Sequence, residues 1–347
     1  MNIKSVTLFL FVLIFTLTAV ELLLRYGAPC YFADDYAAYR HSPELGYRLK
    51  NSLSLRRSAD YQREIYTNKM GTVNFQDDFS NYKTLIFASG DSFTQGAGVP
   101  ADAGYPFQLD LLLNLKGDTY YPNYGVVNLG VAGYGTEQAL LQIRQYQQKI
   151  GAPNYILFLG NETDYQDDLT FRAGGLHRGM LEGNPDYNPL IIRPLQWLQY
   201  ETETGKLVTL FLKSWHTRRG NNKNPSNPQN KTLSKARDLN SVELQGPVLQ
   251  KLINLSKELN ATLIISWVPC YWSKEISPNY VALKQYAIRN NLAFADWYPM
   301  VSSVLDKNPN LPAINYHSAG HYRTWINQMI ARAFAQQIKR TPGLAAD

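Results

Sequence analysis

Ser92 stands in a sequence typical of a nucleophile at the end of a buried strand. The apolar run from residue 82 to 88 continues into Gly90, Asp91 and Ser92. A serine in such a strand-to-helix turn presents its hydroxyl at the carboxyl edge of the sheet. The start of the next helix then offers unpaired backbone N–H groups to an oxyanion. The alternative is that Asp91 or Ser92 only caps that helix.

Two later turns offer further hydrogen-bond donors. The turn NLGVAGYGT follows an apolar run at 125–129 and contains Gly133, and the turn GNETD follows a run at 155–159 and contains Asn161. A glycine-rich turn supplies a close backbone N–H, and an asparagine supplies a side-chain amide. Together with the Ser92 N–H, these groups predict three donors that converge on a tetrahedral acyl intermediate.

These blocks resemble those of the SGNH (GDSL) hydrolase family, and the resemblance extends from about residue 82 to 334, interrupted by an insertion. It implies that Ser92 is the nucleophile and that Gly133 and Asn161 complete an oxyanion hole with the Ser92 N–H. Glu162 stands where the family usually has aspartate. The resemblance further implies a flavodoxin-like, five-stranded sheet.

The C-terminal block, NYHSAGHY, departs from the family's DxxH or DxH pattern and leaves two registers open. Aligned without gaps on Gly320 and His321, the family's histidine falls on Asn315, and Ser92 then has no base. If the loop is two residues shorter, His317 is the general base and Asn315 takes the place of the acid. We favour this second register, because a histidine on the same short loop reaches the same space. We interpret His321 as a structural residue that starts the final helix.

Elements of two kinds alternate around these turns. Short, nearly continuous apolar runs predict strands, and amphipathic stretches of ten or more residues predict helices. The expected strands are 82–88, 125–129, 155–159, 261–268 and 292–297. The expected helices are 107–115, 137–150, one that starts at Pro247, 280–289 and 318–338. This alternation predicts an α/β, doubly wound, mostly parallel sheet with helices on both faces.

The remaining segments suggest a divided chain. We expect a transmembrane anchor at 1–27, a stalk and covering segment at 28–81, and a hydrolase-like domain formed by 82–164 and 246–340. An insertion after the third strand, 165–245, carries a polar, basic, flexible loop.

The N-terminal segment is apolar from Val6 to Val20 and again after Glu21, which is close to the ~20 residues that cross a bilayer. A cleaved signal peptide is the alternative, but no A-x-A-like site follows promptly. We therefore favour a retained anchor with the main domain exported, periplasmic or extracellular. The segments ELGYRLK and GDSFTQGAGV resemble those of envelope-anchored bacterial members of the family.

Composition narrows the classes of function. The chain has 347 residues, 45% of them hydrophobic and 13% aromatic, which excludes a mainly disordered protein. Two cysteines are too few for a disulfide scaffold and lack zinc-site spacing, so we expect neither metal nor cofactor. The formal charge of +6 lies mostly in residues 216–240, which hold six basic residues against one acidic residue. Without a recognition motif, that excess does not indicate a nucleic-acid partner.

The combined interpretation is a membrane-anchored serine esterase of the cell envelope. It would cleave acyl esters, in first place acetyl, of a carbohydrate. One alternative is a carbohydrate O-acyltransferase that uses the same site, because both reactions share the first half-reaction. Another is a catalytically degenerate protein that binds an envelope ligand or protein partner, which Asn315 and Glu162 favour.

Overall fold

The computed structural model describes residues 3–27, 38–58, 62–173, 197–198, 201–208, 211, 241–269, 276–315 and 321–341. The chain divides into two compact units. The first comprises Met1–Lys50 with Arg172–Thr232, and the second comprises Asn51–Phe171 with Leu233–Asp347.

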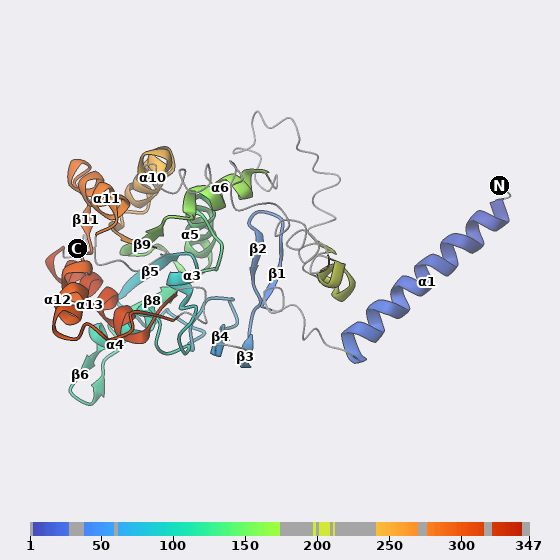
Figure 1. Ribbon diagram of the computed structural model, residues 1–347, viewed down its shortest axis with the longest axis horizontal. Helices are drawn as coiled ribbons and strands as arrows, with labels where there is room; N and C mark the ends of the chain where they lie inside the picture. Colours follow the sequence, from blue (N-terminus) through green and yellow to red (C-terminus); the bar gives the residue numbers. More distant parts are fainter. Residues whose placement is uncertain are drawn as a thin grey trace. The chain divides into compact units, whose positions relative to one another are not determined.

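The second unit is built on a parallel sheet of five strands, as the sequence predicted (Figure 1). The strands are β5 (Thr84–Gly90), β8 (Tyr124–Asn128), β9 (Tyr155–Asn161), β10 (Thr262–Val268) and β11 (Ala293–Phe294). They lie side by side in the order β11-β10-β9-β5-β8, and every neighbouring pair is parallel. This is the flavodoxin-like order, in which the chain reverses its direction of winding between the first and third strands.

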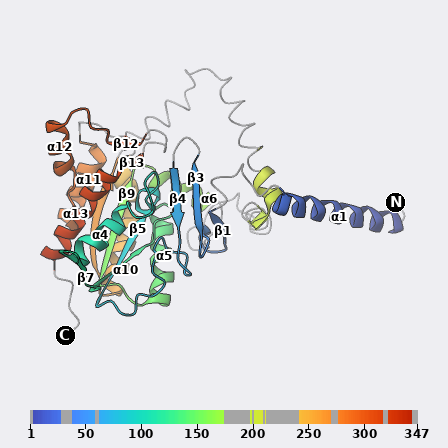
Figure 2. The same cartoon turned by 90° about the horizontal axis from the view of Figure 1, so that it is seen from below.

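Helices cover both faces of this sheet (Figure 2). One face carries α4 (Tyr105–Asn114) and α13 (Thr324–Arg340), and the other carries α5 (Thr136–Ile150), α10 (Ser241–Glu258) and α11 (Pro278–Arg289). The short α3 (Ser92–Gln95) follows β5, α6 (Asp164–Ala173) follows β9, and α12 (Tyr298–Lys307) follows β11. The sandwiched strands are buried on both faces, which explains their continuous apolar runs.

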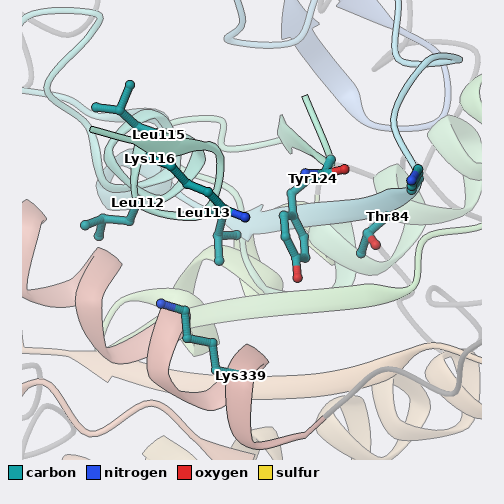
Figure 3. A pocket seen from close by; sticks show the side chains of 9 residues that line it. Thr84, Leu112, Leu113, Leu115, Lys116, Tyr124 and Lys339 are labelled. Carbon is teal, nitrogen blue, oxygen red and sulfur yellow. The ribbon is translucent and has the colours of Figure 1, made fainter. Parts of the chain in front are cut away.

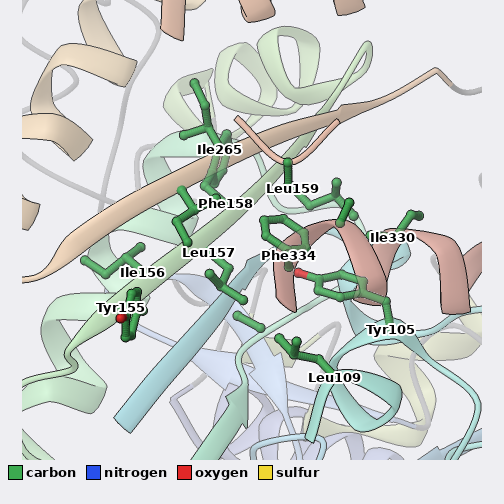
Figure 4. Packing of buried hydrophobic residues seen from close by; sticks show 14 of the residues in the cluster. Tyr105, Leu109, Tyr155, Ile156, Leu157, Phe158, Leu159, Ile265, Ile330 and Phe334 are labelled. Carbon is green, nitrogen blue, oxygen red and sulfur yellow. The ribbon is translucent and has the colours of Figure 1, made fainter. Parts of the chain in front are cut away.

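The core lies between the sheet and these helices (Figure 4). The ring of Tyr105 on α4 stacks on that of Phe334 on α13, with centroids 5.4 Å apart. Strand β9 is buried along its whole length from Tyr155 to Asn161. This dense packing fixes the strand ends, and with them the turns that carry polar residues.

Several small elements were not predicted. They are the hairpins β1 (Tyr39–Ser42) with β2 (Gly46–Leu49), β3 (Ser54–Ser58) with β4 (Gln62–Tyr66), β6 (Leu115–Lys116) with β7 (Thr119–Tyr120), and β12 (Ile314–Asn315) with β13 (His321–Tyr322). Helix α12 was also missed.

Two predicted helix starts are wrong. Helix α10 begins at Ser241, so Pro247 lies inside the helix and not in its first turn. A proline there removes one hydrogen bond, and burial of Val242 and Leu249 holds the early turns in place. Helix α13 begins at Thr324, because the backbone N–H of Arg323 bonds to Ala313 O at 3.0 Å and continues the β12–β13 pairing.

Candidate active site

Ser92 is the first residue of α3, directly beyond the carboxyl end of β5. The turn requires glycine at position 90, because φ is +153° and a Cβ there would lie 2.7 Å from Leu159 O. Asp91 caps the helix, since its Oδ1 accepts the N–H of Phe93 at 2.9 Å. Asp91 therefore caps the helix, and the adjacent half-buried Ser92 carries the hydroxyl that could act as a nucleophile.

His321 contacts the nucleophile candidate. Its Nε2 lies 2.8 Å from Ser92 Oγ, a hydrogen-bond distance suited to proton transfer. The ring of Phe93 packs against the imidazole, with centroids 4.9 Å apart, and limits its rotation. Our interpretation that His321 starts the final helix is wrong, because His321 lies on β13 (His321–Tyr322), and its contact with Ser92 was not predicted.

The structure describes only some of the other residues of the C-terminal block. Asn315 lies opposite His321 in the antiparallel β12–β13 pair, as its Cα partner. His317, which we favoured as the base, lies outside the described residues. We aligned the C-terminal block on the dipeptide Gly320–His321. That dipeptide is the sequence signal that could have identified His321 as the residue in contact with Ser92.

Asn161 is the last residue of β9 and is fully buried. Its Oδ1 accepts the backbone N–H of Thr163 at 2.6 Å and the Thr163 hydroxyl at 2.9 Å. Its Nδ2 donates to Asp91 Oδ2, which also accepts from Ser92 Oγ at 3.2 Å. These bonds fix which end of the amide faces the serine, so its N–H groups lie on the Asp91 and Ser92 side.

Gly133 lies in the turn that follows β8, the strand on the other side of β5. Its φ of +78° is in the left-handed region that favours glycine. The turn packs closely on the start of α3: Ala132 N–H donates to Gln95 Oε1 at 2.7 Å, and a Cβ on Gly130 would lie 2.1 Å from Gln95 N. Gly133 is therefore held near α3 by its neighbours in sequence.

Topology explains why these groups meet. Ser92 follows β5, Asn161 ends β9 and Gly133 follows β8, and β5 lies between the other two strands. All three strands are parallel, so their carboxyl ends share one edge of the sheet. Ligands of doubly wound sheets bind at this edge, where the strand order reverses.

Three carboxyl groups with raised pKa values, two of them buried and that of Asp167 half-buried, lie beside the site and were not predicted from the sequence. Burial raises the pKa of Asp91 to about 7, and the charge of Asp167 adds to the rise. Burial also raises the pKa of Asp164, whose Oδ2 accepts the N–H of Asn161 at 3.1 Å, well above its usual range. Burial raises the pKa of Asp167 to about 6. Like charges at close range cannot all ionise, so this cluster retains protons near neutrality.

Glu162 Oε1 accepts the hydroxyl of Ser277 at 3.0 Å, at the start of α11. Within the described residues, no group of three or more His, Cys, Asp or Glu side chains is arranged to hold a metal ion.

A pocket of about 490 Å³ lies away from Ser92 (Figure 3). Thr84 and Tyr124, the first residues of β5 and β8, line it together with Lys83, Lys116 and Lys339. It is therefore at the amino-terminal edge of the sheet, opposite the candidate active site.

No protein-family model matches the chain, and no curated protein matches it. Solved structures do show similarity. A member of the lipolytic G-D-S-L family from Veillonella parvula is 14% identical, with a TM-score of 0.36, and covers 74% of this chain and 100% of its own. A putative G-D-S-L lipolytic protein from Desulfitobacterium hafniense is 12% identical, with a TM-score of 0.38, over 73% and 99% of the two chains. A catalytic mutant of an acetylxylan esterase from Geobacillus stearothermophilus is 17% identical, with a TM-score of 0.38, over 74% and 94%.

Proposed function

We propose that this protein is a serine ester hydrolase of the SGNH type with Ser92 as nucleophile and His321 as general base. One observation carries the proposal: Ser92 Oγ lies 2.8 Å from His321 Nε2 at the carboxyl edge of a parallel sheet. This contact favours an enzyme over a degenerate binding protein, because a serine needs an adjacent base to become nucleophilic.

The reaction follows from the groups at this edge. Ser92 Oγ attacks the ester carbonyl while His321 Nε2 takes the hydroxyl proton. The backbone N–H of Ser92, that of Gly133 and the Asn161 amide stabilise the oxyanion. His321 then protonates the leaving alcohol, and an acyl-serine remains. Water, deprotonated by His321, attacks this ester, and the acid leaves with regeneration of the Ser92 hydroxyl.

The proposed substrate is an acyl ester, in first place acetyl, of an envelope carbohydrate. This choice depends on the resemblance of the GDSFTQGAGV segment to envelope-anchored family members. Helix α1 (Ile3–Gly27) supports the location, because an 18-residue window within its residues 4–27 has a mean hydropathy of 2.5 and none of that window is buried. We propose that α1 is retained as a membrane anchor and that the second unit is exported.

Transfer of the acyl group to a sugar hydroxyl would use the same first half-reaction.

Hydrolysis of p-nitrophenyl acetate by the full chain in detergent tests this proposal. We expect Ser92→Ala to lower kcat/KM by at least about 10³-fold, because the acyl-enzyme cannot form. Ser80→Ala, at an exposed serine of the same unit, is the matched control and should retain wild-type activity. Wild-type turnover no faster than that of Ser92→Ala would refute an esterase.

A further inference from the structure

The C-terminal part of α1 is hydrogen-bonded to a segment of the insertion. Glu21, the acidic residue of α1, accepts the backbone N–H of Glu203 at 3.0 Å through Oε1. Its Oε2 accepts the N–H and the hydroxyl of Thr204 at 3.0 and 2.9 Å. Arg25 Nη2 donates to Glu21 Oε1 at 2.9 Å and to Glu201 O at 3.1 Å. All of these residues belong to the first unit.

This contact is part of a wider set of polar interactions within the unit. The side chain of Glu201 accepts the backbone N–H of His41 on β1 at 2.7 Å. Lys206 is buried and pairs with Glu203 at 2.6 Å. Residues 201–206 are therefore bonded to α1, to the hairpin and to each other.

The apolar side chains next to this segment point into solvent instead. Trp197, Leu198, Leu207, Val208 and Phe211 are between 39% and 66% exposed. Single exposed apolar residues are ordinary, but five large ones among the described residues from 197 to 211 need an explanation, and we refer to them together as the patch.

The bonds between the neighbouring segment and α1 indicate which surroundings these apolar side chains face. Glu21 lies six residues before Gly27, so it is about 9 Å along the axis from the end of the helix. At that depth a spanning helix leaves the hydrocarbon and enters the headgroup region. Tryptophan and amphipathic segments are favoured there, because one side meets acyl chains and the other meets water.

We propose that the described residues 197–198, 201–208 and 211 form a lipid-facing segment that lies in the membrane interface against the C-terminal turns of α1. The partner is the bilayer surface itself. The inference depends on the proposed retention of α1 as an anchor and deepens it: cleavage after α1 would remove Glu21 and Arg25, which bond to this segment. The anchor would then be a permanent part of the folded first unit.

The test places a fluorophore on the patch in the full chain, reconstituted in phosphatidylethanolamine and phosphatidylglycerol vesicles. Cys30 and Cys270 are first changed to serine, and Phe211→Cys or Val208→Cys is labelled with an environment-sensitive dye. We expect blue-shifted emission, quenching by spin-labelled lipid and protection from iodide. Ser80→Cys in the second unit is the matched control and should be quenched by iodide. Patch labels that iodide quenches as strongly as the Ser80→Cys label would overturn the proposal.

A second variant tests the link to α1. Glu21→Ala should increase iodide quenching of the Phe211→Cys label while the chain still sediments with the vesicles, because the anchor itself is intact. Thr18→Ala in the same helix is the control and should leave the label protected. Unchanged protection in Glu21→Ala would contradict the proposed contact. The mass of the mature chain reports separately whether α1 is retained, and neither readout requires ester hydrolysis.

Discussion

At the residue scale, the sequence placed Ser92 and Asn161 at the ends of buried strands, but it favoured His317 as the base and did not predict the contact of His321 with Ser92. Ser92 and Asn161 follow long buried strands, so their positions depend only on where an apolar run ends. His321 lies on a two-residue strand after a block whose length departs from the family pattern. Neither hydrophobic periodicity nor spacing fixes such a loop, and only its pairing with Asn315 sets its register.

Asn161 provides a test of the oxyanion hole. We expect Asn161→Ala to lower kcat by about 10² to 10³-fold, because one preorganised donor to the oxyanion is lost. Steady-state kinetics on p-nitrophenyl acetate measures this. Thr163→Val is the matched control: it removes the hydroxyl bond to Asn161 Oδ1 but keeps the backbone N–H bond, so its effect should be much smaller. An unchanged kcat in a folded Asn161→Ala protein would exclude an oxyanion role.

At the element scale, the five strands were predicted because each is buried on both faces and therefore apolar throughout. The hairpins β6–β7 and β12–β13 were not, because strands of two residues carry no periodicity. Nor did the sequence reveal that α6 directs its acidic side chains inward. The run ETDYQDD reads as a solvated helix start, yet Asp164 and Asp168 are buried.

The buried carboxyl groups of α6 predict a pH-dependent stability. Burial raises the pKa of Asp167 from 3.8 to about 6, so the folded state keeps a proton that the unfolded state releases. The free energy of unfolding should therefore fall as the pH rises from about 4 to about 6 and remain low above that range. Because asparagine does not ionise, Asp167→Asn should be more stable than the wild type at pH 8 by on the order of 1 kcal/mol, after allowance for solvent screening.

Urea unfolding of the full chain in detergent at pH 4 and pH 8 measures this difference. At pH 4 the advantage of Asp167→Asn should disappear, since the wild-type carboxyl is then neutral in the folded state. Asp306→Asn, at an exposed residue of α12, serves as the control. A stability gain in Asp167→Asn that is equal at both pH values would show that burial of the ionised carboxylate is not its cause.

At the scale of the whole molecule, the sequence predicted an apolar N-terminal helix, an α/β sheet and an insertion after the third strand of that sheet. It did not predict that the N-terminal part and residues from the insertion belong to one compact unit. The bonds between Glu21 and residues 203–204 join positions about 180 apart in the sequence. Such long-range contacts leave no local pattern in the sequence, because each partner by itself is an ordinary polar residue.

The rate at which a fluorophosphonate labels Ser92 tests the central claim most directly, because the reaction needs an activated serine and no knowledge of the substrate. We expect His321→Ala to lower this rate by about 10² to 10⁴-fold, because the general base is lost. His317→Ala should label at the wild-type rate. Labelling that is lost in His317→Ala and unchanged in His321→Ala would contradict the assignment of His321 as the base of Ser92.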